Sequence, residues 1–328
     1  MNTMSERRLL TPEDASADLA TQDVGAALSG AETAGAMTGA GAARPLALPI
    51  SVLILTRNEQ RDIGDCLASV AWSDDVQVLD SCSTDATVAI ARNRGAQVTE
   101  RAFDGYSSQR NFGLHALAWR HDWLLILDAD ERVPAELLPL LAAFVRDAAP
   151  TTAAARIRRR DFWWGRWLKH AQLSPFFIRL VRPARVCYER EINEVLVASG
   201  PIVDLPGYFD HFPFSKGVEH WIARHNTYSR MEAEVIAAGS GIEPSWRTAL
   251  FCADFNERRR HQKALFYRMP GRPFLKLGYS LFVRRAFLDG WPGVRYAILQ
   301  SIYEYFIVLK TRELREQGAT SVSPGGQP

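Results

Sequence analysis

The chain has 328 residues, of which 47% are hydrophobic and 23% charged, as in soluble globular proteins with a substantial core. Its four cysteines include no CxxC pair, which argues against a disulfide framework and against a zinc site. The formal net charge is only +2, but residues 45–150 are acidic and residues 151–328 are basic. Either this basic half is an ordinary solvated surface, or it meets an anionic partner.

The first 46 residues are rich in Ala, Gly, Ser and Thr and nearly free of large apolar side chains. Such a segment buries too little surface to offset its ordering entropy, so we predict disordered tails at 1–46 and 317–328. Neither a secretory signal nor a run of about 18 apolar residues occurs, and we therefore expect a cytoplasmic protein without a clear transmembrane helix.

Apolar segments alternate with helical patterns from residue 47 onwards. We predict strands at 48–56, 75–80, 96–100 and 123–128. Strands that are apolar throughout and separated by helices indicate an α/β domain with a mostly parallel sheet, covered on both faces. Polar residues end three of these strands, and the carboxyl ends of parallel strands are where such sheets bind ligands.

The alternation stops after residue 150, where two further strands are expected before a mostly helical region. We place the sheet domain at 47–212 and a helical subdomain at 213–316. Segments 274–288 and 294–309 are aromatic, apolar and interspersed with Arg, and we predict a helical hairpin joined by DGWPG. This subdomain is either simply packed on the sheet domain or rests on an anionic membrane surface, peripheral to the inner face of the plasma membrane.

The segment LLILDADER (124–132) ends an apolar strand in three carboxylates. Asp128 and Asp130, one residue apart, can share a divalent cation such as Mg²⁺ or Mn²⁺, which often completes its shell with substrate phosphates. The alternative is that these carboxylates only form a turn ahead of Pro134, and we expect Glu131 to act as a cap for the following helix.

Two other segments carry polar residues suited to a nucleotide. Asp80 follows the second strand and is expected to point into the cleft, where it could accept a hydrogen bond from a base or a ribose. Arg110 and Asn111 lie on a predicted helix and could reach a base or a phosphate. The alternative is that Asp80 and its neighbours only begin a well-capped helix.

The order of these segments resembles the family 2 glycosyltransferases, which have the GT-A fold. The matching elements are LTRNE, LDSCSTD, SSQRNFG and LDADE, over residues 48–135. Later segments, including REINEVLVASG and WIARHNTYSRMEA, resemble the branch of lipopolysaccharide-core β-glucosyltransferases and exopolysaccharide transferases. The resemblance implies a Rossmann-like sheet flanked by helices with a C-terminal helical subdomain.

The same resemblance implies an inverting transfer of a sugar from a UDP-sugar to a saccharide or lipid-linked acceptor, in cell-envelope polysaccharide or lipopolysaccharide synthesis. A divalent metal, Mg²⁺ or Mn²⁺, would be the cofactor. The residues implied for the nucleotide sugar are Thr56, Asn58, Glu59, Asp80, Arg110, Asn111 and Asp128, and those for the metal are Asp128, Asp130 and His211.

An inverting transferase also needs a base for the acceptor hydroxyl. The resemblance implies Glu194 for this role, with Glu191 second, although this chain has Asn193 where the branch often has a histidine. The alternative is that Glu194 pairs with an arginine such as Arg179. His211 could be a third metal ligand, a pyrophosphate contact or an ordinary loop histidine.

Three tryptophans, Trp163, Trp164 and Trp167, could stack on an acceptor sugar or pack beneath the subdomain. Other classes fit the sequence less well. A haloacid-dehalogenase phosphatase also uses DxD after a strand, but Arg132 stands where that family has Thr or Val. The basic residues form no recognised nucleic-acid module, and an intact DxD argues against a catalytically idle membrane scaffold.

Overall fold

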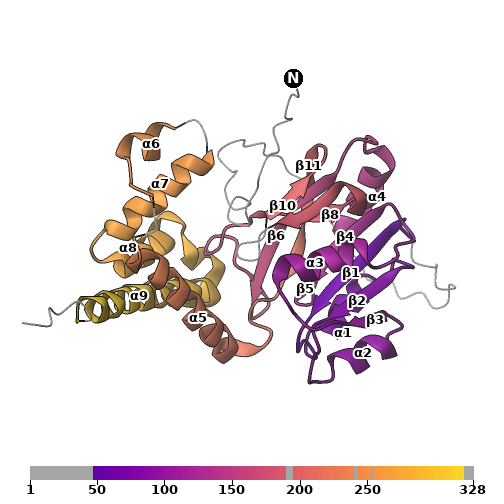
Figure 1. Ribbon diagram of the computed structural model, residues 1–328, viewed down its shortest axis with the longest axis horizontal. Helices are drawn as coiled ribbons and strands as arrows, with labels where there is room; N and C mark the ends of the chain where they lie inside the picture. Colours follow the sequence, from indigo (N-terminus) through magenta and orange to yellow (C-terminus); the bar gives the residue numbers. More distant parts are fainter. Residues whose placement is uncertain (1–46, 190–194, 240–241, 253–254, 321–328) are drawn as a thin grey trace, which may run out of the picture.

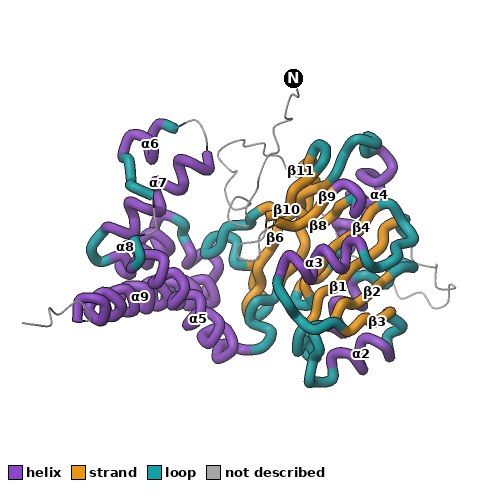
Figure 2. The backbone as a smooth tube through the Cα atoms, viewed as in Figure 1, coloured by secondary structure: helices purple, strands orange, loops and turns teal. Residues whose placement is uncertain are grey.

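The computed structural model describes residues 47–189, 195–239, 242–252 and 255–320. A sheet-bearing part, coloured indigo to pink in Figure 1, lies beside a helical part, coloured orange to yellow, that begins with α5. Figure 2 shows the same division, with the strands gathered in one part. We call these the sheet part and the helical part.

The sheet part contains β1 (Ile50–Thr56), α1 (Ile63–Ser69), β2 (Val76–Asp80), α2 (Thr87–Asn93), β3 (Gln97–Glu100), α3 (Tyr106–His115), β4 (Trp123–Asp128), β5 (Glu131–Arg132), η2 (Ala135–Leu137), α4 (Leu138–Asp147), β6 (Ala154–Trp163), β7 (Arg166–Trp167), β8 (Phe176–Val181), η3 (Pro183–Arg185), β9 (Val186–Glu189), β10 (Val195–Ala198) and β11 (Ile202–His211). The helical part contains α5 (Gly217–Ala237), α6 (Trp246–Phe251), α7 (Phe255–Arg268), α8 (Arg272–Gly278), η4 (Tyr279–Val283), η5 (Ala286–Asp289) and α9 (Gly290–Thr320).

The predicted mostly parallel sheet is confirmed. Its strand order is β3-β2-β1-β4-β8-β6-β11-β5, with β7 paired to β6. Strands β3, β2, β1 and β4 are parallel neighbours. Strand β8 is antiparallel to both β4 and β6, so β6 runs in the same direction as β4. Strand β11 pairs in parallel with β6 and shares this direction. The four strands predicted at 48–56, 75–80, 96–100 and 123–128 are β1 to β4.

The two faces of the sheet have separate cores. Strands β1 and β4 are buried over most of their length, as expected for parallel strands covered on both sides. On one face, Ile63 of α1 and Leu141 of α4 pack with Ile54. On the other, Leu114 of α3 packs with Leu53. The apolar runs of these strands thus follow from burial on both faces.

The link between β4 and β5 forces the sheet to curve. Only Ala129 and Asp130 separate Asp128 from Glu131, so the link spans at most about 11 Å. In the strand order, β5 lies four positions from β4, which would be about 19 Å in a flat sheet. Since β5 pairs with β11, where His211 faces Glu131, the end of β11 must curve back towards the end of β4.

The hairpin expected in the helical part forms differently. The segment predicted as one helix at 274–288 is broken: α8 ends at Gly278, the π-helical turn η4 follows, and Arg285 has a left-handed φ of 58°. Helix α9 already begins at Gly290, so DGWPG leads directly into it, and Pro292 lies in the first turn, where a missing N–H breaks no helical bond. Helix α8 still packs on α9.

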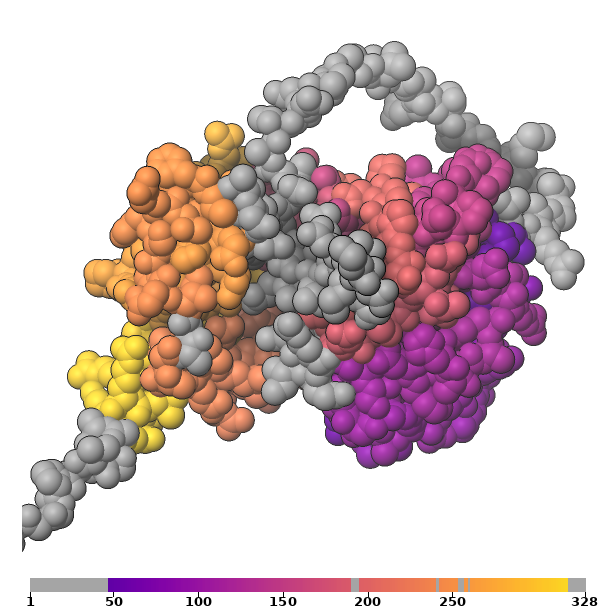
Figure 3. Space-filling view, turned by 45° about the horizontal axis from the view of Figure 1, so that its top comes forward, coloured from indigo at the N-terminus to yellow at the C-terminus, as the bar shows by residue number. Residues whose placement is uncertain are grey.

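Helix α9 continues to Thr320, past the predicted end of the subdomain at residue 316. The tail predicted at 1–46 lies outside the described residues. Across the helices that the structure describes, none combines the length and the apolar character needed to cross a bilayer. In the space-filling view of Figure 3, the helical residues form a mass that adjoins the sheet part.

Candidate active site

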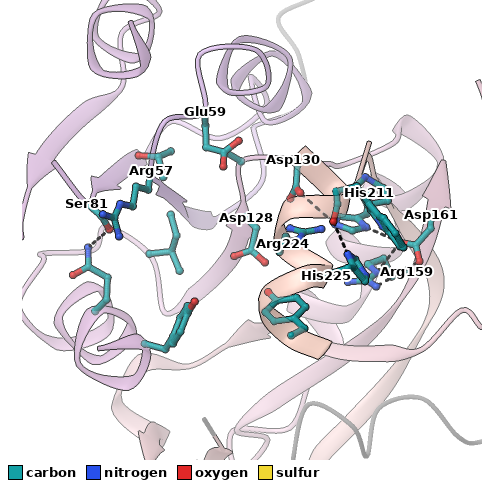
Figure 4. Close-up of a pocket in the computed structure, with 18 of the residues that line it drawn as sticks. Arg57, Glu59, Ser81, Asp128, Asp130, Arg159, Asp161, His211, Arg224 and His225 are labelled. Carbon is teal, nitrogen blue, oxygen red and sulfur yellow. Dashed lines mark hydrogen bonds and ion pairs between the residues drawn. The ribbon is translucent and has the colours of Figure 1, made fainter. Parts of the chain in front are cut away.

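A cavity of about 590 Å³ opens where β1 and β4 end, within the usual size range of small-molecule sites. Strand β1 contributes Thr56, β4 contributes Asp128, and α3 contributes Arg110. Across the cavity, α5 contributes Arg224 and His225 (Figure 4). The sheet part and the helical part therefore share this pocket.

Cations from distant elements neutralise the carboxylates of LLILDADER. Arg179 of β8, which is buried, donates to Asp128 Oδ2 at 2.9 Å and also to Glu131. Arg110 approaches Asp128 Oδ1 at 3.5 Å. Fully buried Glu131 accepts a further bond from the backbone N–H of Asp128 at 3.1 Å. Glu131 therefore holds the turn from inside, and its predicted role as a helix cap is wrong, since Pro134 precedes the next turn without a side-chain cap.

Burial acts differently on the two carboxyl groups that Arg179 contacts. Burial raises the pKa of Asp128, but Arg179 and Arg110 outweigh it, and the pKa falls below its usual range. Burial raises the pKa of Glu131 to about 7 despite the same guanidinium. Asp128 is therefore ionised at neutral pH, and its carboxylate lines the pocket.

His211, at the end of β11, lies between two carboxylates. Its Nε2 is 3.3 Å from Asp130 Oδ2 and its Nδ1 is 2.6 Å from Asp161 Oδ1 (Figure 4). Burial and Arg159 lower the pKa of His211, but Asp130 and Asp161 raise it more, to about 9. Burial raises the pKa of Asp161, while Arg159 and His211 lower it further, to about 2. His211 is therefore an imidazolium that balances Asp130.

These carboxylates fit a cation that shares its shell with phosphate, rather than a site built from protein alone. No group of three or more His, Cys, Asp or Glu side chains suited to a metal occurs within the described residues. Mg²⁺ commonly uses one or two carboxylates together with substrate phosphates, and Asp128 and Asp130 offer these. His211 lines the same pocket with its Nε2 facing Asp130, so it lies beside the pair of carboxylates that could hold a cation.

Thr56 and Asp80 form a buried brace between β1 and β2. Thr56 Oγ1 donates to Asp80 Oδ1 at 2.6 Å, and Ser83 donates to Asp80 through its hydroxyl and its backbone N–H, both at 2.6 Å. Asp80 is fully buried and lies outside the pocket lining, whereas Thr56 and Ser81 line it. Asp80 thus positions the strand ends and does not point into the cleft as expected.

Asn58 and Glu59 follow β1 but point in different directions. Asn58 has a left-handed φ of 55°, and its side-chain oxygen accepts from the Thr84 backbone N–H at 2.8 Å, which ties two loops together. Glu59 lines the pocket and pairs with Lys216. Burial raises the pKa of Glu59 to about 7, although Lys216 opposes the shift. Glu59 therefore belongs to the pocket wall, and Asn58 to its support.

Of the two predicted residues on α3, Arg110 lies in the pocket wall and Asn111 supports it from outside. Arg110 lines the pocket, and its guanidinium carbon lies 5.4 Å from the centre of the Tyr188 ring. Asn111 lies outside the lining, because its side chain exchanges two 2.8 Å hydrogen bonds with the backbone of Tyr188. The expected bases Glu191 and Glu194 lie outside the described residues, in the connection between β9 and β10.

Several charged or ring-bearing side chains of the site were not predicted from the sequence. Arg179 and Arg159 come from β8 and β6, Asp161 from β6, and Arg224 and His225 from α5. One signal was present: Arg179 is the charged residue in the otherwise apolar strand FFIRLV. A charge at a buried strand position requires a buried partner of opposite sign, and here the partners are the DxD segment's own carboxylates.

The three tryptophans separate into packing and exposed roles. Trp163 is buried and stacks on Phe214, with ring centres 4.1 Å apart. Trp164 is 61% exposed, has a left-handed φ of 47°, and lines a smaller cavity of about 290 Å³ with Trp163. Trp167 packs edge-on against Tyr208 at 5.3 Å. Packing therefore accounts for Trp163 and Trp167.

Known proteins resemble this chain along most of its length. A family model described as Glycosyl transferase family 2 matches residues 51–194. An uncharacterized glycosyltransferase of Rickettsia bellii is 26% identical over 272 residues, which are 82% of this chain and 87% of that protein. The lipopolysaccharide core biosynthesis glycosyltransferase LpsC of Rhizobium meliloti is 27% identical over 217 residues, or 62% of this chain and 77% of LpsC.

Solved structures resemble only a part of the chain. Glucosyl-3-phosphoglycerate synthase from Mycobacterium tuberculosis, in complex with Mn²⁺, UDP-glucose and phosphoglyceric acid, is 25% identical with a TM-score of 0.30. The likeness covers 34% of this chain and 43% of that one, so it carries no argument about ligands here.

The matched residues 51–194 contain Thr56, Glu59, Arg110, Asp128 and Asp130, which line the pocket. The match and the glycosyltransferase relatives favour sugar transfer over the phosphatase and the idle scaffold. They also agree with the sheet, whose parallel strands end at the pocket. Residues 51–194 therefore form a domain that matches glycosyltransferase family 2, in a chain whose relatives are named glycosyltransferases.

Proposed function

We propose that this glycosyltransferase transfers a sugar, with inversion, from a UDP-sugar to a saccharide or lipid-linked acceptor in cell-envelope polysaccharide or lipopolysaccharide synthesis. The observation that carries the proposal is the pocket itself, where ionised Asp128 and Asp130 lie among Arg110, Arg159 and Arg224 at the ends of β1 and β4. Such a mixture of charges suits a diphosphate that binds together with a cation. The similarity to LpsC supports the envelope acceptor.

The donor would occupy the sheet side of the pocket. Thr56, Glu59 and Ser81 line this side and offer polar groups to a base and a ribose. Arg110 lies beside Asp128 and would contact a phosphate oxygen, because a guanidinium suits that geometry. Asp80 acts indirectly, by holding Thr56 through its 2.6 Å hydrogen bond.

Asp128 and Asp130 would hold Mg²⁺ or Mn²⁺ together with the diphosphate. When bound, the cation would act as a Lewis acid that stabilises charge on the leaving nucleoside diphosphate. His211 would be a third ligand of this cation or would contact the same diphosphate, because its Nε2 faces Asp130. Asp161 in turn orients the His211 ring through Nδ1.

Inversion needs a base that removes the acceptor proton as the new bond forms. The acceptor oxygen attacks the anomeric carbon, the bond to the diphosphate oxygen breaks, and UDP leaves with that electron pair. We assign the base to Glu194, with Glu191 as the second candidate. Tyr188, in the strand β9 that precedes both residues in the sequence, packs on Arg110 in the pocket wall.

The decisive variant for donor turnover is Asp130→Ala. We expect it to abolish hydrolysis and transfer of UDP-sugars in a panel assay supplied with Mg²⁺ or Mn²⁺, while the unfolding transition stays cooperative. Asp147→Ala, which removes an exposed carboxylate of α4, is the matched control and should keep full turnover. Full activity of the Asp130 variant would overturn the metal and diphosphate role.

The base is tested separately with Glu194→Gln. This variant should bind UDP in titration calorimetry as the unchanged protein does, yet lose transfer to the acceptor. Glu191→Gln is the paired variant. If Glu194→Gln transfers normally and Glu191→Gln does not, the base is Glu191, and if both transfer normally, neither residue is the base.

A further inference from the structure

The segment from α8 to the start of α9 exposes many of its large apolar side chains. Six of them are between 51% and 80% exposed, and we call these six the aromatic face: Phe274, Tyr279, Phe282, Val283, Phe287 and Trp291. The buried residues of the segment from α8 to η5 are small or polar: Arg272, Pro273, Ser280, Ala286 and Asp289. This arrangement is the reverse of ordinary packing, and contiguous apolar surface of this kind marks an interaction site.

The aromatic face is held rigidly in this orientation. Buried Asp289 accepts from the backbone N–H groups of His170 and Ala171 at 2.8 and 2.7 Å, and lies 2.6 Å from the His170 ring. Arg284 donates to the carbonyl oxygens of His170 and Gln172, both at 3.1 Å. These bonds fix the polar side of the segment to the sheet part, so its apolar side must face outwards.

Positive charge accompanies the aromatic face. Residues 272–295 contain one acidic side chain, Asp289, which is 2% exposed, and several basic ones: Arg272, Lys276, Arg284, Arg285 and Arg295. Arg295 lies over the rings of Trp291 and Trp164, at 5.9 and 4.8 Å from their centres. Aromatic side chains beside basic ones match the interface of an anionic bilayer. Two copies of this surface would instead repel each other.

The apolar surface continues from Trp291 along α9. Ile298, Ile302, Tyr305 and Leu309 are each at least 41% exposed. Their spacing of three and four residues places them on one side of the helix, in line with Trp291. Tyr296, next to Arg295 on the same helix, lines the sugar-transfer pocket. Trp291 of the aromatic face therefore precedes this residue of the pocket wall by five positions on the same helix.

We propose that the aromatic face is a docking surface for an anionic lipid bilayer. Its rings enter the interface between headgroups and acyl chains, while Arg285 and Arg295 contact headgroup phosphates. The enzyme then lies on the membrane with its pocket wall at α9 close to the surface. This inference concerns where the protein binds and does not depend on which sugar or acceptor it uses.

Flotation of the full chain with vesicles tests the proposal. The protein should float with mixed phosphatidylcholine and phosphatidylglycerol vesicles, float far less with pure phosphatidylcholine, and be released by high salt. Phe282→Ser with Trp291→Ser should lower partitioning about tenfold or more, because both side chains lose apolar contact. Arg285→Gln with Arg295→Gln should lower it by about fivefold for each charge removed.

A matched control is Phe251→Ser on α6, which removes a side chain of 81% exposure outside the aromatic face and should float normally. Absence of the unchanged protein from anionic vesicles would overturn the proposal, as would equal flotation of all variants. If Phe282→Ser with Trp291→Ser instead converts a dimer to a monomer in light scattering, the face binds a second copy. Hydrolysis of UDP-sugars without lipid should be unchanged in these variants, which separates this test from that of sugar transfer.

Discussion

The sheet part and the helical part differ in which side chains they bury and which they expose. In the sheet part, Arg179 and Glu131 are buried together beneath the pocket, and large side chains such as Ile54 and Phe209 are fully buried. In the helical part, the segment from α8 to the start of α9 exposes large aromatic side chains such as Phe274 and Phe282 and buries small or polar ones. A dense core can hold ion pairs in fixed positions for chemistry, whereas a thin one leaves apolar surface for a partner.

The largest expected effect comes from removing the buried guanidinium of Arg179 in the sheet part. Arg179→Met should lower the free energy of unfolding by about 3–5 kcal/mol, because Glu131 and Asp128 lose their shared partner. Urea denaturation measures the loss. Arg146→Met, at an exposed ion pair with Asp147, is the control and should leave the free energy of unfolding nearly unchanged. Equal stability of both variants would mean that the buried cluster is not held by Arg179.

A second test follows the pH dependence of stability. The pKa of Glu59 rises from 4.5 to about 7 on folding, mainly through burial, so the folded state binds more protons between these values. Stability should therefore fall as pH rises through this window, and Glu59→Gln should remove up to about 3 kcal/mol of that fall. Thermal unfolding at several pH values measures it.

Glu131, whose pKa also rises to about 7, should keep a residual slope in the Glu59 variant. Glu136→Gln, at a mostly exposed carboxylate, is the control and should leave the slope nearly unchanged. An identical slope in the unchanged protein and Glu59→Gln would show that Glu59 does not carry this dependence.

A third variant compares the tightness of packing in the two parts. A Cβ added at Gly113 of α3 would lie 2.5 Å from Leu53 Cδ2, whereas one at Gly278 of α8 would meet no heavy atom within 4 Å. Gly113→Ala should cost about 1–3 kcal/mol by forcing α3 away from the sheet. Gly278→Ala should be neutral or stabilise by up to about 1 kcal/mol. Chemical denaturation of both variants measures the two changes in the free energy of unfolding. An unchanged stability of Gly113→Ala would contradict the close approach of α3 to Leu53.

The smallest effect concerns a local cap in the helical part. Ser245 is the N-cap of α6, and its hydroxyl accepts from the Thr248 backbone N–H at 3.3 Å. Ser245→Ala should cost about 1 kcal/mol or less, while Ser245→Thr keeps the acceptor and most of the stability. Hydrogen exchange of the backbone N–H groups at the start of α6 measures this local stability. Unchanged protection in the alanine variant would show that the Ser245 hydroxyl does not stabilise the helix.

The sequence was sufficient for the strands because burial on both faces leaves a continuous apolar run, as in LPISVLILT and WLLILD. Polar residues at the strand ends indicated Glu59, Asp128 and Asp130 because the ends of parallel strands meet at one edge of a sheet, and the resemblance to a known family added Thr56 and Arg110. The strands themselves needed only the local pattern of apolar residues.

The sequence was insufficient where polar side chains satisfy one another across loops. Asp80, Asn58 and Asn111 are as polar as the pocket residues, yet each is held by a neighbour. The pairing of Arg179 with Asp128, and of His211 with Asp130, depends on the curvature of the sheet, which no local pattern encodes. The break at Arg285 depends on a single left-handed residue.

The short link of Ala129 and Asp130 also limits how this site can diversify. Because it ties β4 to the outermost strand, the width of the pocket and the curvature of the sheet cannot change independently. The irregular pairing of β11 between Leu205 and Tyr208, where Gly207 has a φ of 128°, is where the strand departs from regular geometry. A chain that accommodates a larger donor would have to alter this irregularity and the acidic link together, so the two should be redesigned as one unit.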